Sequence, residues 1–420
     1  MINEVEVYLD APEPVRVGVL RPSYTGGRNL ASASFLYDPA FVSNPEAYEI
    51  SPDLPLRTSR TFTPQNTNMF GAFSDASPDE WGQKIIDANH AVRFKKDPQL
   101  PRRLGAFDYL LGVSDHSRMG ALRVRASSDT AWLSSDTAVA NLHDLEKVIA
   151  AARRYDAHEA SDEDVAYLAG IATSPGGARP KANVVTDSGT LAIAKLPHSK
   201  DGNIDVEAWE AVALSIANDI GIAIPEFFVR RASDDKAVLI SQRFDRSASG
   251  TRIGYMSAAT ALGIGSNDDR RVTYEEFADT IAELSANPVE DLHEMFARVA
   301  LTVLINNTDD HWHNHGFVRN KQGWRLSPVF DVNPNPRHGV LTSRAISDQD
   351  DPTDRDIANL VATASAYKLG RQQAINVIQS VVVAIDRWPS VARSFDIPED
   401  QFPIMARAFD EEHLTRARNL

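Results

Sequence analysis

The sequence of 420 residues predicts an α+β fold, in which a strand-rich first half is followed by a mostly helical second half. Two observations lead to this prediction. Short strand-like runs separated by turn residues recur up to about residue 246. Beyond that point apolar residues recur at helical spacing. We therefore expect three parts, at residues 1–150, 151–246 and 247–420.

The composition is that of an ordinary globular protein, and it excludes several kinds of site. The chain contains no cysteine, which excludes disulfides, thiolate metal sites and a cysteine nucleophile. Its formal charge of −15 argues against direct binding to the DNA backbone, which needs clustered Lys and Arg residues. The sequence has no signal peptide and no run of about 18 apolar residues, so we expect a cytoplasmic protein without membrane contact.

The first part is expected to consist of short strands and turns with some helix. Val5–Leu9 and Val15–Leu20 have strand-like content on either side of a turn with two prolines. Residues 22–68 are rich in Pro, Ser, Asn and Thr, which indicates long loops. A helix is expected to begin near Asp79.

The middle part contains a tight loop of glycine and proline residues, Ser174–Lys181. Small residues let backbone N–H groups approach phosphate oxygens closely, and a lysine adds positive charge. An ordinary turn between strands would have the same composition. The elements expected after this loop are strands at residues 182–186 and 191–196, a helix at 203–220 and a hairpin at 227–244.

Two charged residues of the middle part suit nucleotide binding. Lys195 lies in an apolar strand, where its ammonium group can hold phosphates, and Glu210 on the following helix is its candidate partner. Lone charges usually face water, so either residue could instead be solvated. The strand Val238–Arg246 precedes the helical part, and such a connecting segment can offer backbone groups to an adenine edge.

Helices are expected throughout the last part. A capping box at Thr273–Glu276 opens one helix. Pro288 fits the first turn of the next helix, which runs to about Ile305. Two further helices are expected at residues 370–388 and 398–419.

The most informative segment follows the helix that begins at Pro288. Asp309 lies five residues before Asn314, and Asp331 comes after an apolar, strand-like segment. This order and spacing suit phosphoryl transfer to a hydroxyl group. Asp309 would engage the acceptor hydroxyl, while Asn314 and Asp331 would hold Mg²⁺ against the phosphates of a nucleotide.

The order of the parts makes this interpretation specific. The parts follow one another in the order found in a two-lobed protein kinase. They are the glycine-rich loop, the strand lysine, the helix glutamate, the connecting strand, the Asp-x4-Asn segment and the final Asp. The histidines allow a different interpretation. His311, His313 and His315 alternate, and on a strand they would share one face. With Asp309 and Asp310 they could form the metal site of a hydrolase.

The chain resembles the HipA family of serine/threonine kinases, the toxins of bacterial type II toxin–antitoxin modules. The resemblance covers nearly the whole length, and it implies a two-lobed kinase-like fold with an added N-terminal subdomain and a mostly helical C-terminal domain. Segments of the N-terminal region such as Ser77–Gly82 also resemble the family. The strongest pieces are Gly176–Lys181, Gln242–Arg246, Thr308–Asn314 and Pro328–Asp331.

The resemblance implies a role for each candidate residue. Asp309 would be the catalytic aspartate, and Asn314 and Asp331 would bind Mg²⁺. Ser174 matches a loop serine whose autophosphorylation inactivates the family's kinases. A phosphate dianion in the loop would repel ATP, so this role is physically reasonable. The residues assigned to ATP binding are Ser174, Gly176, Gly177, Ala178, Lys181, Lys195, Glu210, Gln242, Phe244 and His311.

The resemblance also implies partners. One is a small DNA-binding antitoxin of the HipB type, and the other is a cytosolic protein substrate. The chain would contact DNA only indirectly, through the antitoxin. Family substrates include aminoacyl-tRNA synthetases. The chain departs from the family at His313, where a lysine is common, and at Gln242, where a glutamate is frequent. Two alternatives stay open: a non-catalytic, kinase-like co-repressor that binds an antitoxin, and the metal-dependent hydrolase.

Overall fold

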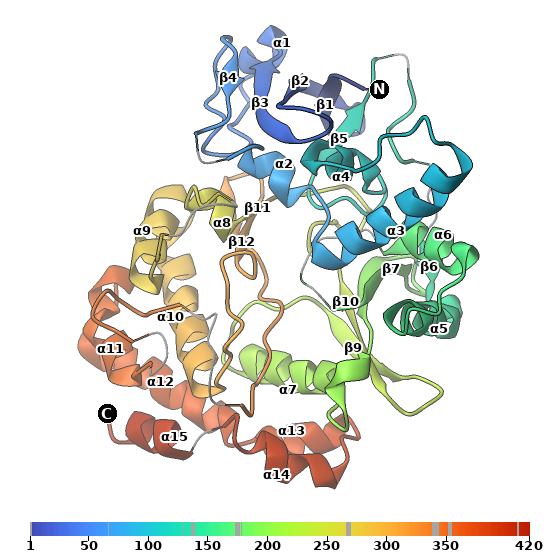
Figure 1. Ribbon diagram of the computed structural model, residues 1–420. Coiled ribbons are helices and arrows are strands. Elements are labelled where there is room, and N and C mark those ends of the chain that lie inside the picture. The colour runs from blue at the N-terminus through green and yellow to red at the C-terminus, as the bar shows by residue number, and fades with distance from the viewer. Residues whose placement is uncertain are drawn as a thin grey trace. The chain divides into compact units, whose positions relative to one another are not determined.

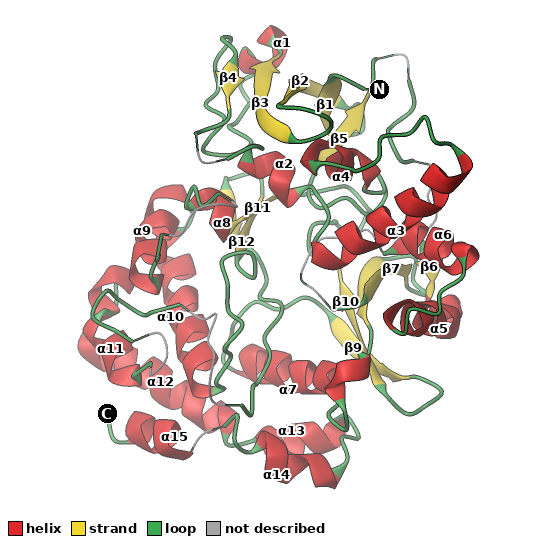
Figure 2. Cartoon of the chain, in the orientation of Figure 1, coloured by secondary structure: helices red, strands yellow, loops and turns green. Residues whose placement is uncertain are grey.

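The structure is a computed structural model that describes residues 2–65, 67–128, 130–135, 139–172, 177, 179–265, 270–337, 344–351, 355–409 and 411–420. Its contacts group the chain into two compact units. The first unit contains Met1–Ser199 and Gln242–Asp268, and the second contains Lys200–Ser241 and Asp269–Leu420. The three-part division expected from the sequence stays a prediction. Both units mix helices and strands, as the α+β class requires (Figure 1, Figure 2).

The first unit contains a five-stranded antiparallel sheet with the strand order β4-β3-β2-β1-β5. Two of these strands confirm the expected pair, but residues 22–68 are not only loops. Ala33, Phe35 and Tyr37 are buried at every second position, a strand pattern that the neighbouring Ser32 and Ser34 obscured. The strands are β1 (Val5–Leu9), β2 (Val15–Tyr24), β3 (Leu30–Tyr37), β4 (Thr61–Phe62) and β5 (Leu122–Arg125).

A second group of strands in this unit consists of β6, which precedes the glycine-rich loop in the sequence, and of β7 and β8, which come at its end and after it. β7 pairs with β8 in antiparallel fashion and with the short β6 in parallel fashion, which confirms the two strands expected there. The remaining strand of the unit is β11 (Gly254–Ser257), and the bounds of the others are β6 (Ala140–Asn141), β7 (Lys181–Val185) and β8 (Leu191–Lys195).

The longest helix of the first unit is α3 (Glu80–Lys96), which begins where the sequence predicts. The Asp79 side chain caps it by accepting a hydrogen bond from the Gly82 N–H at 2.6 Å. The other helices are α1 (Pro39–Val42), α2 (Gly71–Asp75), α4 (Ala106–Gly112), α5 (Leu145–Asp156), α6 (Asp162–Ile171) and α8 (Ala258–Ala261).

A buried ion network connects the Gln242–Arg246 segment to the N-terminal part of the same unit. Asp245 is fully buried and accepts two hydrogen bonds from Arg243, both at 2.6 Å. It also accepts hydrogen bonds from Arg246 and from the Gly120 N–H, each at 2.7 Å. Burial acts to raise the pKa of Asp245, but Arg243 and Arg246 outweigh it and lower the pKa to about 2. Asp245 is therefore ionised at neutral pH and acts as a structural crosslink.

The second unit begins with α7 (Val206–Asp219), which starts three residues later than expected because the chain first makes a short turn. The expected hairpin is formed by β9 (Phe227–Arg231) and β10 (Ala237–Gln242). The expected capping box opens α9 (Tyr274–Leu284), where Thr273 and Glu276 bond reciprocally. Pro288 begins α10 (Pro288–Leu304), which is also as predicted.

The C-terminal segment differs from its prediction. The single helix expected over residues 398–419 is replaced by a 3₁₀ turn and two helices, because Pro403 is tolerated only in the first turn of a helix. The elements of this part are β12 (Gly316–Arg319), β13 (Trp324–Leu326), α11 (Ile357–Ala362), α12 (Arg371–Ile385), α13 (Trp388–Ser394), α14 (Phe402–Met405) and α15 (Glu411–Arg418).

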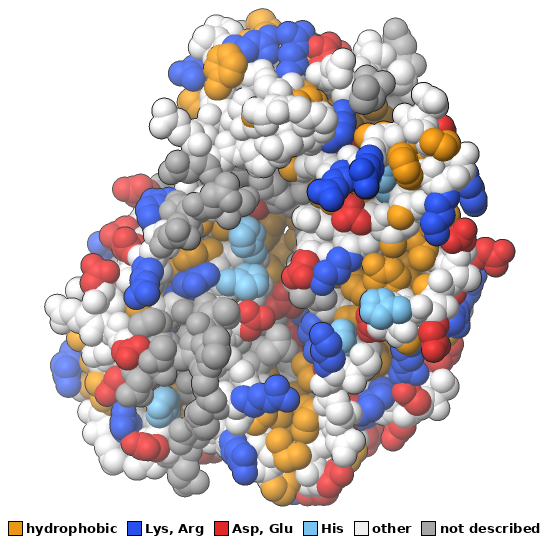
Figure 3. Space-filling view, viewed as in Figure 1, with side chains coloured by type: hydrophobic (Ala, Val, Ile, Leu, Met, Phe, Trp, Pro, Cys, Tyr) orange, Lys and Arg blue, Asp and Glu red, His pale blue; other side chains and the backbone are white. Residues whose placement is uncertain are grey.

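The surface and the helices carry two further observations. Acidic and basic side chains are interspersed over the face drawn in Figure 3. Among the described residues, every helix is too short or too polar to span a bilayer.

Candidate active site

The segment with the candidate catalytic residues directly follows α10. Asn306 has a positive φ of 51°, which turns the chain out of the helix. Its side chain donates a hydrogen bond to the backbone oxygen of Asn335 at 2.7 Å. Asn335 in turn donates to the hydroxyl of Thr308 at 2.5 Å. These contacts hold the start of the loop in place.

Asp309 and Asn314 meet within this loop. The Asn314 Nδ2 donates to the backbone oxygen of Asp309 at 2.9 Å, and the Asn314 N–H donates to the His311 oxygen at 2.8 Å. Because the amide nitrogen is used in this way, the Oδ1 atom of Asn314 is the one suited to a hard cation such as Mg²⁺. The Asp309 side chain is exposed and accessible to a substrate.

Asp331 has an unusual backbone conformation. Its φ is +55°, a region that costs free energy for residues other than glycine, although Asp and Asn tolerate it best. The Asp331 N–H donates to Oε1 of Glu210 at 3.1 Å, and Glu210 is buried on α7. This contact was not foreseen from the sequence. Glu210 therefore fixes the position of the Asp331 backbone.

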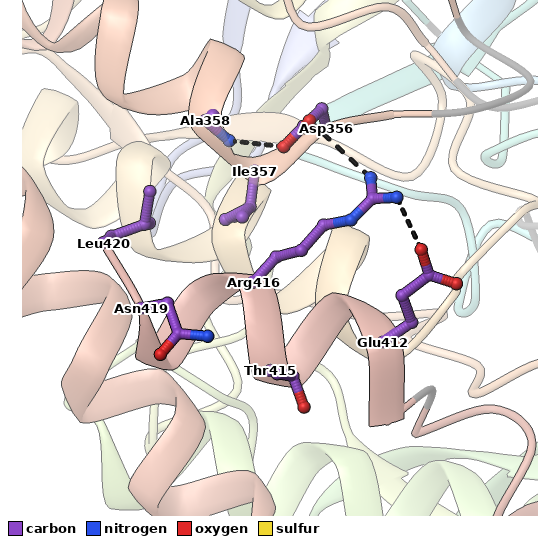
Figure 4. A pocket seen from close by; sticks show the side chains of 8 residues that line it. All are labelled: Asp356, Ile357, Ala358, Glu412, Thr415, Arg416, Asn419 and Leu420. Carbon is purple, nitrogen blue, oxygen red and sulfur yellow. Dashed lines mark hydrogen bonds and ion pairs between the residues drawn. The ribbon is translucent and has the colours of Figure 1, made fainter.

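A cavity of about 10 Å³ places the Asp331 segment beside the loop of residues 307–315, which contains the candidate catalytic Asp309. Phe330 and Val332, on either side of Asp331, line it together with Asn307 and Asn314. A larger surface pocket of about 550 Å³ lies between α11 and α15 (Figure 4). Arg416 crosses that pocket to Glu412 at 2.6 Å and to Asp356 at 3.7 Å. The described residues that line it do not include the candidate catalytic residues.

The three histidines of the loop do not share one face, because the segment is a turn and not a strand. His315 is buried, and its Nε2 bonds to Oδ1 of Asp310 at 2.9 Å. His311 and His313 instead face each other, with ring centroids 5.9 Å apart. Among the described residues, no group of three His, Asp or Glu side chains is placed to hold a metal. The hydrolase interpretation therefore lacks the three-histidine site on which it depended.

Two groups in the loop have shifted pKa values. Burial acts to raise the pKa of Asp310, but His315 and Tyr274 outweigh it and lower that pKa, so the carboxylate stays charged. The His313 side chain is exposed, but neighbouring protein atoms partly desolvate it, and its pKa is lowered to about 4. Desolvation is the larger cause, and the electrostatic effects of His311 and Arg344 act in the same direction. His313 is neutral at neutral pH, so it cannot supply the charge of the family's lysine.

Lys181 has an acidic partner that the sequence did not predict. Its Nζ lies 3.0 Å from Oδ2 of Asp79, and both side chains are almost fully buried. Trp81 donates from Nε1 to the Lys181 oxygen at 3.2 Å. The resemblance of Ser77–Gly82 to the family was the available signal. Gly177, whose φ is +90°, lies over the ammonium group, since a Cβ built there would be 3.4 Å from Nζ.

The remaining candidate residues stay predictions. Ser174, Gly176 and Ala178 lie outside the described residues. Lys195 ends β8 and is half-buried, and its pairing with Glu210 is untested. Gln242 and Phe244 are also half-buried, at the end of β10 and just beyond it.

Two family models match the chain, and both describe HipA domains. The family model of the HipA N-terminal domain matches residues 6–125, and that of the HipA-like C-terminal domain matches residues 173–388. The structure is similar to a chain in the complex of HipA, HipB and operator DNA from Shewanella oneidensis MR-1. The TM-score is 0.70 at 16% identity, with 99% of this chain and 97% of that chain covered. This likeness confirms the predicted HipA-like α+β fold.

Two other similar proteins match only part of this chain. A putative kinase of Haemophilus influenzae is 26% identical over 142 residues, which are 30% of this chain and 41% of that protein. The chain thus spans about two-fifths of that relative's length. The Helicobacter pylori proinflammatory kinase CtkA matches with a TM-score of 0.36 at 16% identity, over 58% of this chain and 94% of that chain.

Proposed function

The chain belongs to the HipA family, and we propose that it is an ATP- and Mg²⁺-dependent protein serine/threonine kinase acting as the toxin of a type II toxin–antitoxin module. One observation carries the proposal. The loop presents an exposed Asp309 next to an Asn314 whose amide oxygen suits a cation, and the Asp331 segment lies beside them. This is the set of groups that transfer of a phosphoryl group to a hydroxyl requires.

Each residue of this set has its own task. Asp309 accepts a hydrogen bond from the substrate hydroxyl and orients it toward the phosphate. Asn314 Oδ1 and the Asp331 carboxylate would hold Mg²⁺, which would supply positive charge against the phosphates. Two protein ligands are sufficient, since Mg²⁺ usually keeps several waters and binds substrate phosphates. Catalysis then comes from placement and charge neutralisation.

The nucleotide contacts from the rest of the chain are part of the same proposal. Lys195 binds ATP phosphates and Ser174 accepts a phosphate from the kinase itself. The backbone of Gln242 and Phe244 contacts adenine, and His311 lies beside the nucleotide. Lys181 contributes less than an unpaired lysine would, because Asp79 already neutralises its charge.

The proposed partners follow the family. The similar Shewanella chain was determined with HipB and operator DNA. We propose that this chain binds a HipB-like antitoxin and reaches DNA only through it. The substrate would be a cytosolic protein, with aminoacyl-tRNA synthetases as the first candidates because the family that the chain resembles includes kinases acting on them.

Incubation with γ-labelled ATP tests the proposed activity. The purified chain is incubated with Mg²⁺ and casein as an added acceptor. We expect label on the chain, on casein or on both, and we expect Asp309→Ala to lower the labelling rate by about 10³-fold, because it removes the group that orients the hydroxyl. Calorimetric titration with ATP, with and without Mg²⁺, is run in parallel as a binding control.

The outcomes separate the alternatives. Binding of Mg²⁺-ATP with no labelling above the Asp309→Ala level would overturn the kinase proposal in favour of the non-catalytic co-repressor. Absence of both binding and labelling would overturn ATP use altogether. Equal labelling of Ser174→Ala and wild type would remove Ser174 as the site of autophosphorylation.

Variants of Glu210 test whether this residue acts as the acceptor of the Asp331 N–H or as a charge partner of Lys195. Gln keeps an oxygen acceptor and loses the charge, whereas Ala loses both. We expect Glu210→Gln to keep at least a third of the labelling rate, and Glu210→Ala to lose about 10-fold or more, as for a lost hydrogen bond of about 1.5 kcal/mol. Equal losses in the two variants would show that the charge is what matters.

A further inference from the structure

The catalytic loop contains a second aspartate, for which the proposed chemistry has no use. Asp309 is exposed, but its neighbour Asp310 is buried to 3% exposure. Asp309 meets Asn314, and Asp310 meets His315, so two contacts of the same five-residue spacing run side by side through the loop. The first contact includes the exposed Asp309, which we propose to meet the substrate. The second contact joins two buried side chains.

Both oxygens of the Asp310 carboxylate have partners. His315 Nε2 donates to Oδ1 at 2.9 Å, and the hydroxyl of Tyr274 donates to Oδ2. Tyr274 is fully buried and is the first residue of α9. The network therefore ties two points of the loop, at residues 310 and 315, to one end of α9, whose Phe277 also packs against the loop residues Trp312 and His315.

The surroundings of this network are rigid. The Tyr274 ring packs edge-on against Trp312 at 5.6 Å, and Trp312 is itself a buried residue of the loop. Arg355 is also buried and donates to the Asn307 oxygen at 3.0 Å, just before the loop. In such an environment a carboxylate that loses a hydrogen bond cannot recover it from bulk water, so the loop must move to compensate.

The geometry argues against a direct chemical role for Asp310. A general base must reach the proton that it abstracts, but Asp310 is buried beneath the loop with both oxygens engaged. A metal ligand would need an oxygen directed to the same point as Asn314 Oδ1. The adjacent cavity is only about 10 Å³, too small for a magnesium nucleotide.

We infer that Asp310, Tyr274 and His315 form a positioning network that sets the distance between Asp309 and Asn314, an inference that rests on the proposed kinase function for its catalytic consequence. Because Asp309 and Asp310 are neighbours, as are Asn314 and His315, drawing residues 310 and 315 together fixes the separation of the hydroxyl-orienting group and the cation ligand. Small errors in such placement are costly for transfer.

The test compares two deletions of a single hydroxyl. Tyr274→Phe removes the donor to Asp310. Tyr367→Phe is the matched control, because Tyr367 is equally buried but donates to the backbone oxygen of Tyr274 at 3.2 Å. We expect Tyr274→Phe to lower kcat for casein labelling about 10-fold while KM for ATP changes less than about 2-fold. Tyr367→Phe should leave both within about 2-fold.

A second pair of variants tests His315. His315→Gln keeps an N–H donor, and His315→Phe fills the space without one. We expect His315→Gln to recover most of the kcat that His315→Phe loses. Thermal unfolding of all variants is compared, since a merely structural role would lower melting temperature and activity together and would show no rescue. Equal kcat losses for Tyr274→Phe and Tyr367→Phe, or no rescue by Gln, would overturn the inference.

Hydrogen–deuterium exchange gives a readout that does not need activity. We expect the peptide covering residues 305–317 to exchange about 10-fold faster in Tyr274→Phe than in wild type, and to be unchanged in Tyr367→Phe. If the wild-type chain transfers no phosphate, the kinase proposal fails. The exchange rate alone then decides whether the positioning network exists. Unchanged exchange in Tyr274→Phe would refute the network whether or not the chain is a kinase.

Discussion

Replacing Asp331 is expected to abolish phosphoryl transfer almost completely. Asp331→Asn keeps the shape of the side chain and tolerates the backbone φ of +55°, but it removes the negative charge that would hold Mg²⁺ in the proposed site. A loss on the order of 10³-fold in the labelling rate is expected, comparable to the removal of a central electrostatic group from an active site. The measurement is the initial rate of γ-phosphate transfer at saturating ATP over a range of Mg²⁺ concentrations.

A second variant separates the ligand from the backbone. Asp331→Ala removes the same carboxylate and in addition places a residue with a Cβ and no local hydrogen bond in the left-handed region, which costs about 1–2 kcal/mol. We expect the two variants to be equally inactive and only Asp331→Ala to be less stable in urea. Retention of more than about a tenth of the wild-type rate by Asp331→Asn would remove Asp331 from the metal site.

The largest effect on stability is expected at Asp245. Asp245→Ala leaves Arg243 and Arg246 buried beside each other without their shared carboxylate, and the Gly120 N–H without an acceptor. Breaking a buried ion pair in this way costs about 3–5 kcal/mol. Urea unfolding at pH 7 measures it. Asp279→Asn, on an exposed position of α9, is the control and should change stability by less than about 0.5 kcal/mol.

The same residue predicts a pH dependence. The pKa of Asp245 is about 2 in the folded chain, below the ordinary value of 3.8. Its contribution is therefore fully present above about pH 4 and is lost as the pH falls toward 2. The wild type should lose stability more steeply across this interval than Asp245→Asn. Parallel stability curves for the two proteins between pH 4 and pH 2 would contradict the network.

Local patterns in the sequence were sufficient for most elements. The capping box at Thr273–Glu276 and the proline at position 288 are signals read within one helical turn, and both helices begin there. The prediction for residues 398–419 failed because a periodic apolar pattern was weighed above Pro403. β3 was missed because its two serines, Ser32 and Ser34, are typical of a loop rich in turn residues.

The sequence selected candidate residues for the site, whose roles stay predictions, but it could not give their contacts. Spacing singled out Asp309 and Asn314, and the structure places the two residues in one loop. Spacing could not show that His315 bonds to Asp310 while His311 contacts His313, since side-chain direction in a turn does not follow strand alternation. The pairing of Lys181 with Asp79 joins segments far apart in the chain, and the charges of single residues do not reveal such a pair.

The pairing of Lys181 with Asp79, together with the bond from Gly120 to Asp245, has a consequence for how this family can be dissected. Asp79 and Gly120 fall within the N-terminal family model, while Lys181 and Asp245 fall within the C-terminal one. A fragment beginning at residue 126 would keep Lys181 without its carboxylate partner, and Asp245 without the Gly120 N–H that donates to it. The regions matched by the two family models are thus joined by buried contacts in the folded chain. Truncation is therefore a poor way to isolate either region.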